Sequence, residues 1–274
     1  WSALGSGMNN WVLALSVFDD GGGSALYAGG VFTTAGGVAA NRIAKWDGSS
    51  WSALGTGMNG EVRSLSVFYD GGGLALCAGG AFNSAGGAAA RSIAKWNGSS
   101  WSALGSDVRG GPYAFSVFDD GGGPALYAGG MLLGTNNIAK WNGSIWLALS
   151  SGMDFTVHAL SGFDDGGGPE LYAGGQFTTA GGVAANYIAK WNGSSWSALG
   201  SGMDNWVRAL SVFDDGGGPA LYAGGEFTTA GGVAANFIAK WNGTSWSALG
   251  SGMSSGVRAL SVFDDGGGPA LYAG

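Results

Sequence analysis

Residues able to perform acid–base, nucleophilic or metal chemistry are scarce in this sequence. It has one histidine, His158, and one cysteine, Cys77, in 274 residues. Zinc and copper sites built from histidine and cysteine need more ligands than these two side chains supply. The acidic residues outside turn sequences are scattered, and no spacing pairs two of them: Glu61, Asp107, Asp154, Glu170, Asp204 and Glu226. The sequence therefore predicts no catalytic residue, no metal and no cofactor. A glycoside hydrolase stays open as an alternative, because carboxylates that the fold brought about 5 to 9.5 Å apart would suit that reaction.

Six acidic clusters precede runs of glycine, from Asp19-Asp20 at the start of the chain to Asp264-Asp265 near its end. Calcium prefers several carboxylate oxygens. However, the alternating spacing of calcium loops is missing, and adjacent side chains on an extended chain point to opposite faces. Aspartate followed by glycine also favours tight turns, so we expect turns at these clusters.

Asn-Gly-Ser/Thr sequences recur at Asn97, Asn142, Asn192 and Asn242, and Asp47 takes this place in the first repeat. In a secreted eukaryotic protein the four asparagines would be acceptors for glycosylation. Asn-Gly and Asp-Gly are also the preferred sequences of two-residue hairpin turns. Because Asp47 suits only the second role, we expect hairpin turns here.

Composition excludes two classes of partner. The formal net charge is -7, and the 11 lysines and arginines are spread along the chain. Nucleic-acid binding needs clustered basic residues, so we expect no nucleic-acid partner. No run approaches 18 consecutive apolar residues, so we expect no membrane span.

The sequence repeats itself about every 50 residues, which is the dominant signal for its fold. The string WSALG, or its variant WLALS, begins at Trp1, Trp51, Trp101, Trp146, Trp196 and Trp246. The repeats cover residues 1–50, 51–100, 101–145, 146–195, 196–245 and, in part, 246–274, and we treat 1–274 as one domain. The third repeat is five residues shorter between residues 131 and 138, which marks a surface loop there.

Each repeat holds four short apolar runs separated by turn sequences. In the unit that spans residues 207–250 they are residues 207–213, 220–225, 237–241 and 246–250. Runs of this length, rich in β-branched and aromatic residues, indicate strands. Four antiparallel strands per repeat, stacked around an axis, predict an all-β fold, a β-propeller.

Counting strands predicts five complete blades between residues 12 and 249. A sixth, closing blade would be shared by both ends of the chain. Residues 257–263 and 270–274 would supply its first and second strands, and residues 1–5 its fourth, while the third is missing.

The double glycine that ends the second strand (Gly29-Gly30 and its repeats) and the sequence KWDGSSW at residues 45–51 resemble kelch repeats. The pattern departs from kelch by one residue between the aromatics, and the kelch arginine pattern is absent. The chain is more similar to glycine-rich, kelch-like repeats of bacterial secreted proteins and fungal cortical-marker proteins. This resemblance implies a propeller and, with the acidic, lysine-poor composition, an extracellular or cell-surface location. The copper chemistry of kelch-fold galactose oxidase would require a second histidine.

Positions that vary between otherwise similar repeats gather in loops expected on one face of the ring. As candidate ligand-binding residues we single out Trp11, Arg42, Glu61, Arg109, Phe155, Gln176, Tyr187, Trp206, Glu226 and Phe237. Exposed aromatics beside polar groups suit a carbohydrate or peptide ligand. Unconstrained drift of loop sequences is the alternative explanation.

A further variable position lies within the first strand of each repeat. His158 stands there, where the other repeats have Leu13, Arg63, Tyr113, Arg208 and Arg258. We interpret this position as a tolerant strand edge.

These observations favour a non-catalytic extracellular binding scaffold for a protein or a surface polysaccharide. A multivalent lectin with equivalent sites on several blades is the first alternative, and a hydrolase is the second. The loop aromatics do not repeat from blade to blade, which a lectin with equivalent sites would require.

Overall fold

The computed structural model describes residues 3–106 and 108–274, so Trp1, Ser2 and Asp107 lie outside the described residues. All regular structure in the described ranges is β-strand. These described residues therefore include no helix that is long and apolar enough to cross a bilayer.

Five four-stranded antiparallel sheets form the body of the protein, one for each complete repeat. The first contains β1 (Val12–Asp19), β2 (Ser24–Gly30), β5 (Ile43–Trp46) and β6 (Trp51–Ala53). The second contains β7 (Glu61–Tyr69), β8 (Leu74–Ala81), β11 (Ile93–Trp96) and β12 (Trp101–Ala103). The third contains β13 (Arg109–Asp119), β14 (Pro124–Leu133), β15 (Ile138–Trp141) and β16 (Trp146–Ala148). The fourth contains β17 (Val157–Asp164), β18 (Pro169–Gly175), β21 (Ile188–Trp191) and β22 (Trp196–Ala198). The fifth contains β23 (Val207–Asp214), β24 (Pro219–Gly225), β27 (Ile238–Trp241) and β28 (Trp246–Ala248).

Small two-stranded hairpins connect the second and third strands in four of the repeats. They are β3 (Thr34–Ala35) with β4 (Val38–Ala39), β9 (Ser84–Ala85) with β10 (Ala88–Ala89), β19 (Thr179–Ala180) with β20 (Val183–Ala184), and β25 (Thr229–Ala230) with β26 (Val233–Ala234). In the third repeat a short turn between β14 and β15 takes the place of the hairpin. The five-residue deletion therefore falls in a connection, as the sequence predicts.

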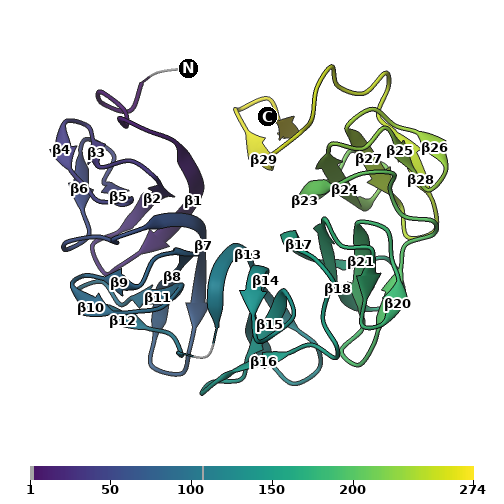
Figure 1. Ribbon diagram of the computed structural model, residues 1–274. Coiled ribbons are helices and arrows are strands. Elements are labelled where there is room, and N and C mark those ends of the chain that lie inside the picture. The colour runs from purple at the N-terminus through teal and green to yellow at the C-terminus, as the bar shows by residue number, and fades with distance from the viewer. Residues whose placement is uncertain (1–2, 107) are drawn as a thin grey trace.

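The sheets are arranged as blades around an axis, with the first strand of each blade innermost (Figure 1). Neighbouring first strands contact one another in the order β1, β7, β13, β17 and β23, and β23 contacts β29. The prediction of a propeller built from four-stranded antiparallel blades is confirmed.

The sixth sheet consists of β29 (Leu260–Asp264) and β30 (Pro269–Ala273) alone. The ring is open between this sheet and the first blade (Figure 1). The described part of the N-terminal segment does not join the sixth sheet and instead lies against the first repeat, where Met8 bridges to Ala35. In every complete blade the fourth strand pairs only with the third. The sixth sheet lacks the third strand, which is the partner of the fourth strand in the complete blades.

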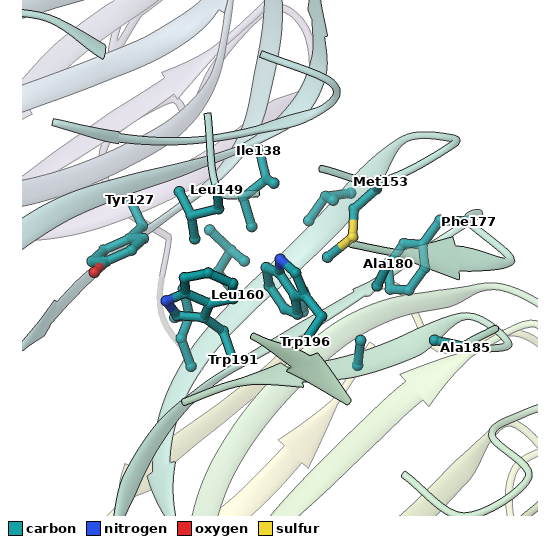
Figure 2. Close-up of a cluster of buried hydrophobic side chains, with 14 of the residues drawn as sticks. Tyr127, Ile138, Leu149, Met153, Leu160, Phe177, Ala180, Ala185, Trp191 and Trp196 are labelled. Atoms are coloured by element: carbon teal, nitrogen blue, oxygen red, sulfur yellow. The ribbon is translucent and has the colours of Figure 1, made fainter. Parts of the chain in front are cut away.

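The interfaces between blades form the core. One cluster joins Tyr127 and Ile138 of the third blade to Leu160, Trp191 and Trp196 of the fourth (Figure 2). Pairs of tryptophans on the third and fourth strands pack with ring centroids 5.3–5.5 Å apart. Four fourth-strand indoles donate a hydrogen bond to a leucine carbonyl of the preceding repeat: Trp51, Trp101, Trp146 and Trp246. The recurring tryptophans are therefore packing residues, and they link each repeat to the one before it.

The double glycine has a steric role at each of its two positions. A Cβ on Gly129 would lie 2.5 Å from Val157 Cγ1 of the next blade. A Cβ on Gly130 would collide with the carbonyl group of Gly111, on the neighbouring strand of its own blade. The first glycine thus permits close packing between blades, and the second permits close pairing within a blade.

We expect Gly129→Ala to destabilise the protein by about 1–3 kcal/mol, because the added methyl group must displace a packed valine. Gly167→Ala is the matched control. Its Cβ would lie 3.5 Å from Asp165 Oδ1, at ordinary contact distance, and the residue has no positive φ. Urea unfolding followed by tryptophan fluorescence measures both changes. Equal stability of the two variants would contradict the packing role of Gly129.

Candidate functional site

A β-bulge in the first strand of each complete blade aims one side chain toward the axis. In blade four, Val157 pairs with Gly175 and Ala159 pairs with Gly174, so His158 between them has no partner residue. The equivalent shifts leave Leu13, Arg63, Tyr113 and Arg208 unpaired. A bulge of this kind re-aims the side chain of its extra residue. The double glycine is the strand segment that faces the bulge.

These bulge residues line a cavity of about 490 Å³ at the centre of the ring, which we call the axial pocket. Its lining residues are Trp11, Leu13, Glu61, Arg63, Tyr113, His158, Arg208 and Arg258. Each of the six repeats contributes at least one of them, and Arg258 precedes β29 in the sixth. The axial pocket is therefore a single site in which the repeats contribute different chemistry.

A chain of contacts crosses the pocket from the second blade to the fourth. Arg63 donates a hydrogen bond to the carboxylate of Glu61. The Arg63 guanidinium also lies 4.5 Å from the ring centroid of Tyr113, in a cation–π contact. The Tyr113 and His158 rings meet edge to face at 5.1 Å.

The contacts continue into the fifth blade through Arg208. Its Nη1 lies 3.2 Å from His158 Nε2, and its guanidinium lies 4.7 Å from the ring centroid of Trp206. Its buried Nε has no hydrogen-bond partner, and the nearest carboxylate oxygen, on Glu226, is 3.7 Å away. Arg208 is thus held in place on three sides while one of its donors is unsatisfied.

His158 is neutral at physiological pH. Burial and the neighbouring Arg208 guanidinium lower its pKa to about 4. Arginine can only donate hydrogen bonds, so Nε2 of His158 is the acceptor and carries no proton. The positive charge of the pocket therefore comes from arginine alone.

The axial pocket has more positive than negative charge, although the chain as a whole carries a formal charge of -7. Arg63, Arg208 and Arg258 face Glu61 in the lining, with Glu226 beside Arg208. Among the described residues, no carboxylate forms an ion pair with Arg258. One arginine therefore stays available to an incoming anion.

The structure brings four of the predicted binding residues to this pocket. Trp11 and Glu61 line it, and Trp206 and Glu226 contact Arg208. The indole of Trp11 is 75% exposed.

The other six predicted residues lie outside the axial pocket. Arg109 is exposed at the start of β13, opposite Leu133, and Phe155 is exposed before β17. Gln176 is half-buried after β18. Arg42, Tyr187 and Phe237 precede third strands with φ of 64–65°. Arg42 lines a separate groove between the first two repeats.

The prediction missed the residues that define the pocket. His158 does lie on an edge strand of its sheet, and the sequence did not indicate that its half-buried side chain lines the axial pocket. The available signal was one position with changing chemistry, from leucine to arginine, tyrosine and histidine, inside a strand that is otherwise nearly constant.

The repeated acidic clusters form turns, as the sequence predicts. Asp19 accepts hydrogen bonds from the backbone N–H groups of Gly21 and Gly23. Asp20 accepts one from Tyr27 and one from Lys45, at 2.7 and 2.6 Å, and the bond from Lys45 lowers the pKa of Asp20. No group of three or more possible metal-ligating residues occurs within residues 3–106 and 108–274.

The Asn-Gly sequences form the predicted turns as well. Asn192 Oδ1 accepts hydrogen bonds from the backbone N–H groups of Ser194 and Ser195, and Asp47 does the same with Ser49 and Ser50. Cys77 is buried where the other repeats have tyrosine, and burial raises its pKa to about 12. This thiol is therefore unsuited to act as a nucleophile.

No protein-family model matches this chain, and no curated protein matches it. The similarity to kelch-like repeats stays a prediction, while the repeated four-stranded sheets are observed directly.

We expect the stability of the protein to fall between pH 6.5 and pH 4 partly because of His158. Its pKa is lower in the folded protein than in the unfolded chain, so the stability that neutral His158 contributes is present above pH 6.5. It is lost as the pH falls through about 4. The loss is on the order of 1–3 kcal/mol.

Urea unfolding of the wild type and of His158→Gln across this range isolates the effect. Glutamine can still accept a hydrogen bond from Arg208 but does not titrate, so its stability should fall less steeply. Parallel curves for the two proteins would contradict the assignment.

Proposed function

We propose that this protein is a non-catalytic binding module that holds an acidic saccharide of a surface polysaccharide in the axial pocket. The observation that carries this proposal is the combination of three arginines with aromatic side chains around one central cavity.

The charges favour an anionic ligand. Arginine binds carboxylates through two parallel hydrogen bonds. Among the described residues Arg258 has no ion pair, and Arg208 has only a long one to Glu226, whose oxygen is 3.7 Å from an Nε that makes no hydrogen bond. Within a chain of formal net charge -7, the local excess of arginine makes this pocket the favoured place for an anion.

The shape and the aromatic groups favour a sugar. A cavity of about 490 Å³ lies in the range of small-molecule sites, and it is too small for a protein surface of standard size. The rings of Trp11 and Tyr113 can pack against the C–H faces of a pyranose ring. A uronic acid combines such a face with a carboxylate.

The site residues argue for one ligand per ring rather than equivalent sites on several blades. The equivalent position of the six repeats holds one leucine, one tyrosine, one histidine and three arginines, so the blades do not carry equivalent sites. This arrangement does not favour a multivalent lectin.

The glutamates of the pocket favour binding over glycoside hydrolysis. Glu61 and Glu226 both lie against arginines. A general acid needs a carboxyl group that apolar surroundings keep protonated. Neither glutamate has such surroundings, which supports binding without turnover.

We expect the protein to bind oligogalacturonate and to bind its methyl ester at least tenfold more weakly, since esterification removes the charge and keeps the sugar. Arg208→Gln should weaken oligogalacturonate binding by tenfold or more, as a hydrogen bond to a charged group is lost. Arg91→Gln is the matched control, because Arg91 is exposed and outside the pocket. Isothermal titration calorimetry measures all four affinities.

Equal binding of the acid and its ester would exclude recognition of the carboxylate. Release of new reducing ends during incubation would show a hydrolase instead of a binding module.

A further inference from the structure

The interface between the second and third blades is open at a place where the other interfaces between complete blades are closed. At the closed interfaces, a glycine in the turn between the third and fourth strands lies against the carbonyl oxygen of the second turn aspartate of the preceding blade. An added Cβ would lie 2.6–2.9 Å from that oxygen in three pairs: Gly98 with Asp20, Gly193 with Asp120, and Gly243 with Asp165. A Cβ on Gly143, the equivalent residue of the third blade, would meet no other described segment within 4 Å.

A groove of about 430 Å³ occupies this open place, and we call it the interblade groove. Its lining includes Tyr69 and Asp70 of the second blade and Lys140, Asn142 and Gly143 of the third. The volume lies in the range of small-molecule sites. The interblade groove shares no lining residue with the axial pocket.

Tyr69 accounts for the different turn of the second blade. The other five repeats have aspartate at this position, and in the first of them Asp19 accepts hydrogen bonds from the backbone N–H groups of Gly21 and Gly23. Tyrosine has no carboxylate to accept these two bonds, and Gly73 has a φ of 138°, against 94–107° at the equivalent glycines of the other repeats. The side chain of Tyr69 is 60% exposed. The substitution therefore changes the turn and presents an aromatic ring at the groove.

The charged groups of the interblade groove are already paired. Asp70 forms an ion pair with Lys95, and Lys140 forms one with Asp120. In the other complete blades a tyrosine hydroxyl also donates a hydrogen bond to the aspartate equivalent to Asp70, but Cys77 stands in place of that tyrosine in the second blade. The Asp70 carboxylate can therefore accept a hydrogen bond from a hydroxyl group, while the groove offers no unpaired charge to an ionic ligand.

Asn142 supplies a hydrogen-bond donor. Its Oδ1 accepts hydrogen bonds from the backbone N–H groups of Ser144 and Ile145 at 3.0 and 2.9 Å. No hydrogen bond within the described part of the chain uses its Nδ2, and the residue is exposed. An acceptor, a donor and an exposed aromatic ring without net charge suit a sugar that has hydroxyl groups and an apolar C–H face but no ionic group.

We propose that the interblade groove binds one neutral pyranose unit of a carbohydrate. A hydroxyl group of the sugar donates a hydrogen bond to Asp70, another accepts one from Asn142, and the C–H face of the ring packs on Tyr69. This site is additional to the axial pocket and does not depend on the acidic saccharide proposed there.

The experiment uses the whole protein and the methyl glycosides of glucose, galactose, mannose, fucose and N-acetylglucosamine. We expect saturation-transfer difference NMR to detect binding of at least one of them, and isothermal titration calorimetry measures its affinity. Tyr69→Asp introduces the residue of the other five repeats and should weaken this binding about tenfold or more, because the aromatic contact is lost. Leu74→Ser, which introduces the residue of the first repeat at an exposed neighbouring position outside the groove, is the matched control.

A second variant removes the donor and keeps the turn. Asn142→Asp should bind the same glycoside about threefold to tenfold more weakly, as expected for one lost hydrogen bond. The turn should survive, because Asp47 makes the same backbone hydrogen bonds in the first blade. Asn192→Asp is the same change in the fourth blade and should leave the affinity unaltered.

Absence of binding by all these glycosides, or equal binding by the wild type and Tyr69→Asp, would overturn the proposal. Equal effects of Asn142→Asp and Asn192→Asp would overturn it as well, because the sugar would then lie elsewhere. Oligogalacturonate binding at the axial pocket is measured separately, so failure of one proposal is distinguishable from failure of the other.

Discussion

The architecture depends on the double glycine of each repeat, which allows neighbouring blades and neighbouring strands to pack closely. The first glycine lies against an apolar side chain of the next blade, and the second lies against a carbonyl group of the neighbouring strand. A side chain at either place would separate surfaces that must touch. The same segment faces the bulge of the first strand, so one pair of residues determines both the spacing of the blades and the direction of the side chain that enters the axial pocket.

Much of the fold follows from local sequence. Turn sequences such as Asp19-Asp20 and Asp47-Gly48 separate runs of strand length, and their hydrogen bonds are local. Strand order and blade number then follow from counting repeats. The bulge does not follow in this way, because it depends on the register between two strands, and a shift of one residue reverses which face a side chain occupies. For this reason the sequence could indicate Trp11 and Glu61 as loop residues near the axis but not His158 as a residue facing it.

The structure separates two kinds of residue that alternate along the sequence, those that are nearly constant between repeats and those that vary. The turns and middle strands carry nearly the same groups in each blade, such as the hydrogen-bonded Asp20, Tyr27 and Lys45, and these groups hold each blade together. In the second blade Cys77 replaces the tyrosine. One position of the innermost strands varies between leucine, tyrosine, histidine and arginine, and these side chains meet at the axis. The nearly constant residues therefore lie within the blades, which all need the same internal contacts. The variable residues lie around the axial pocket, to which all six repeats contribute.

The shortened connection of the third repeat has a consequence for assembly. Because the units are nearly identical, a second strand can pair with the third strand of the wrong unit and still meet matching side chains. Misassembly of this type is a characteristic failure of repeat proteins. The third unit has a short turn between β14 and β15 in place of the small hairpin, which makes it unlike its neighbours. A chain assembled one unit out of step would place this turn where a hairpin is required. The irregular third unit thus favours one pairing of second strands with third strands along an otherwise uniform array.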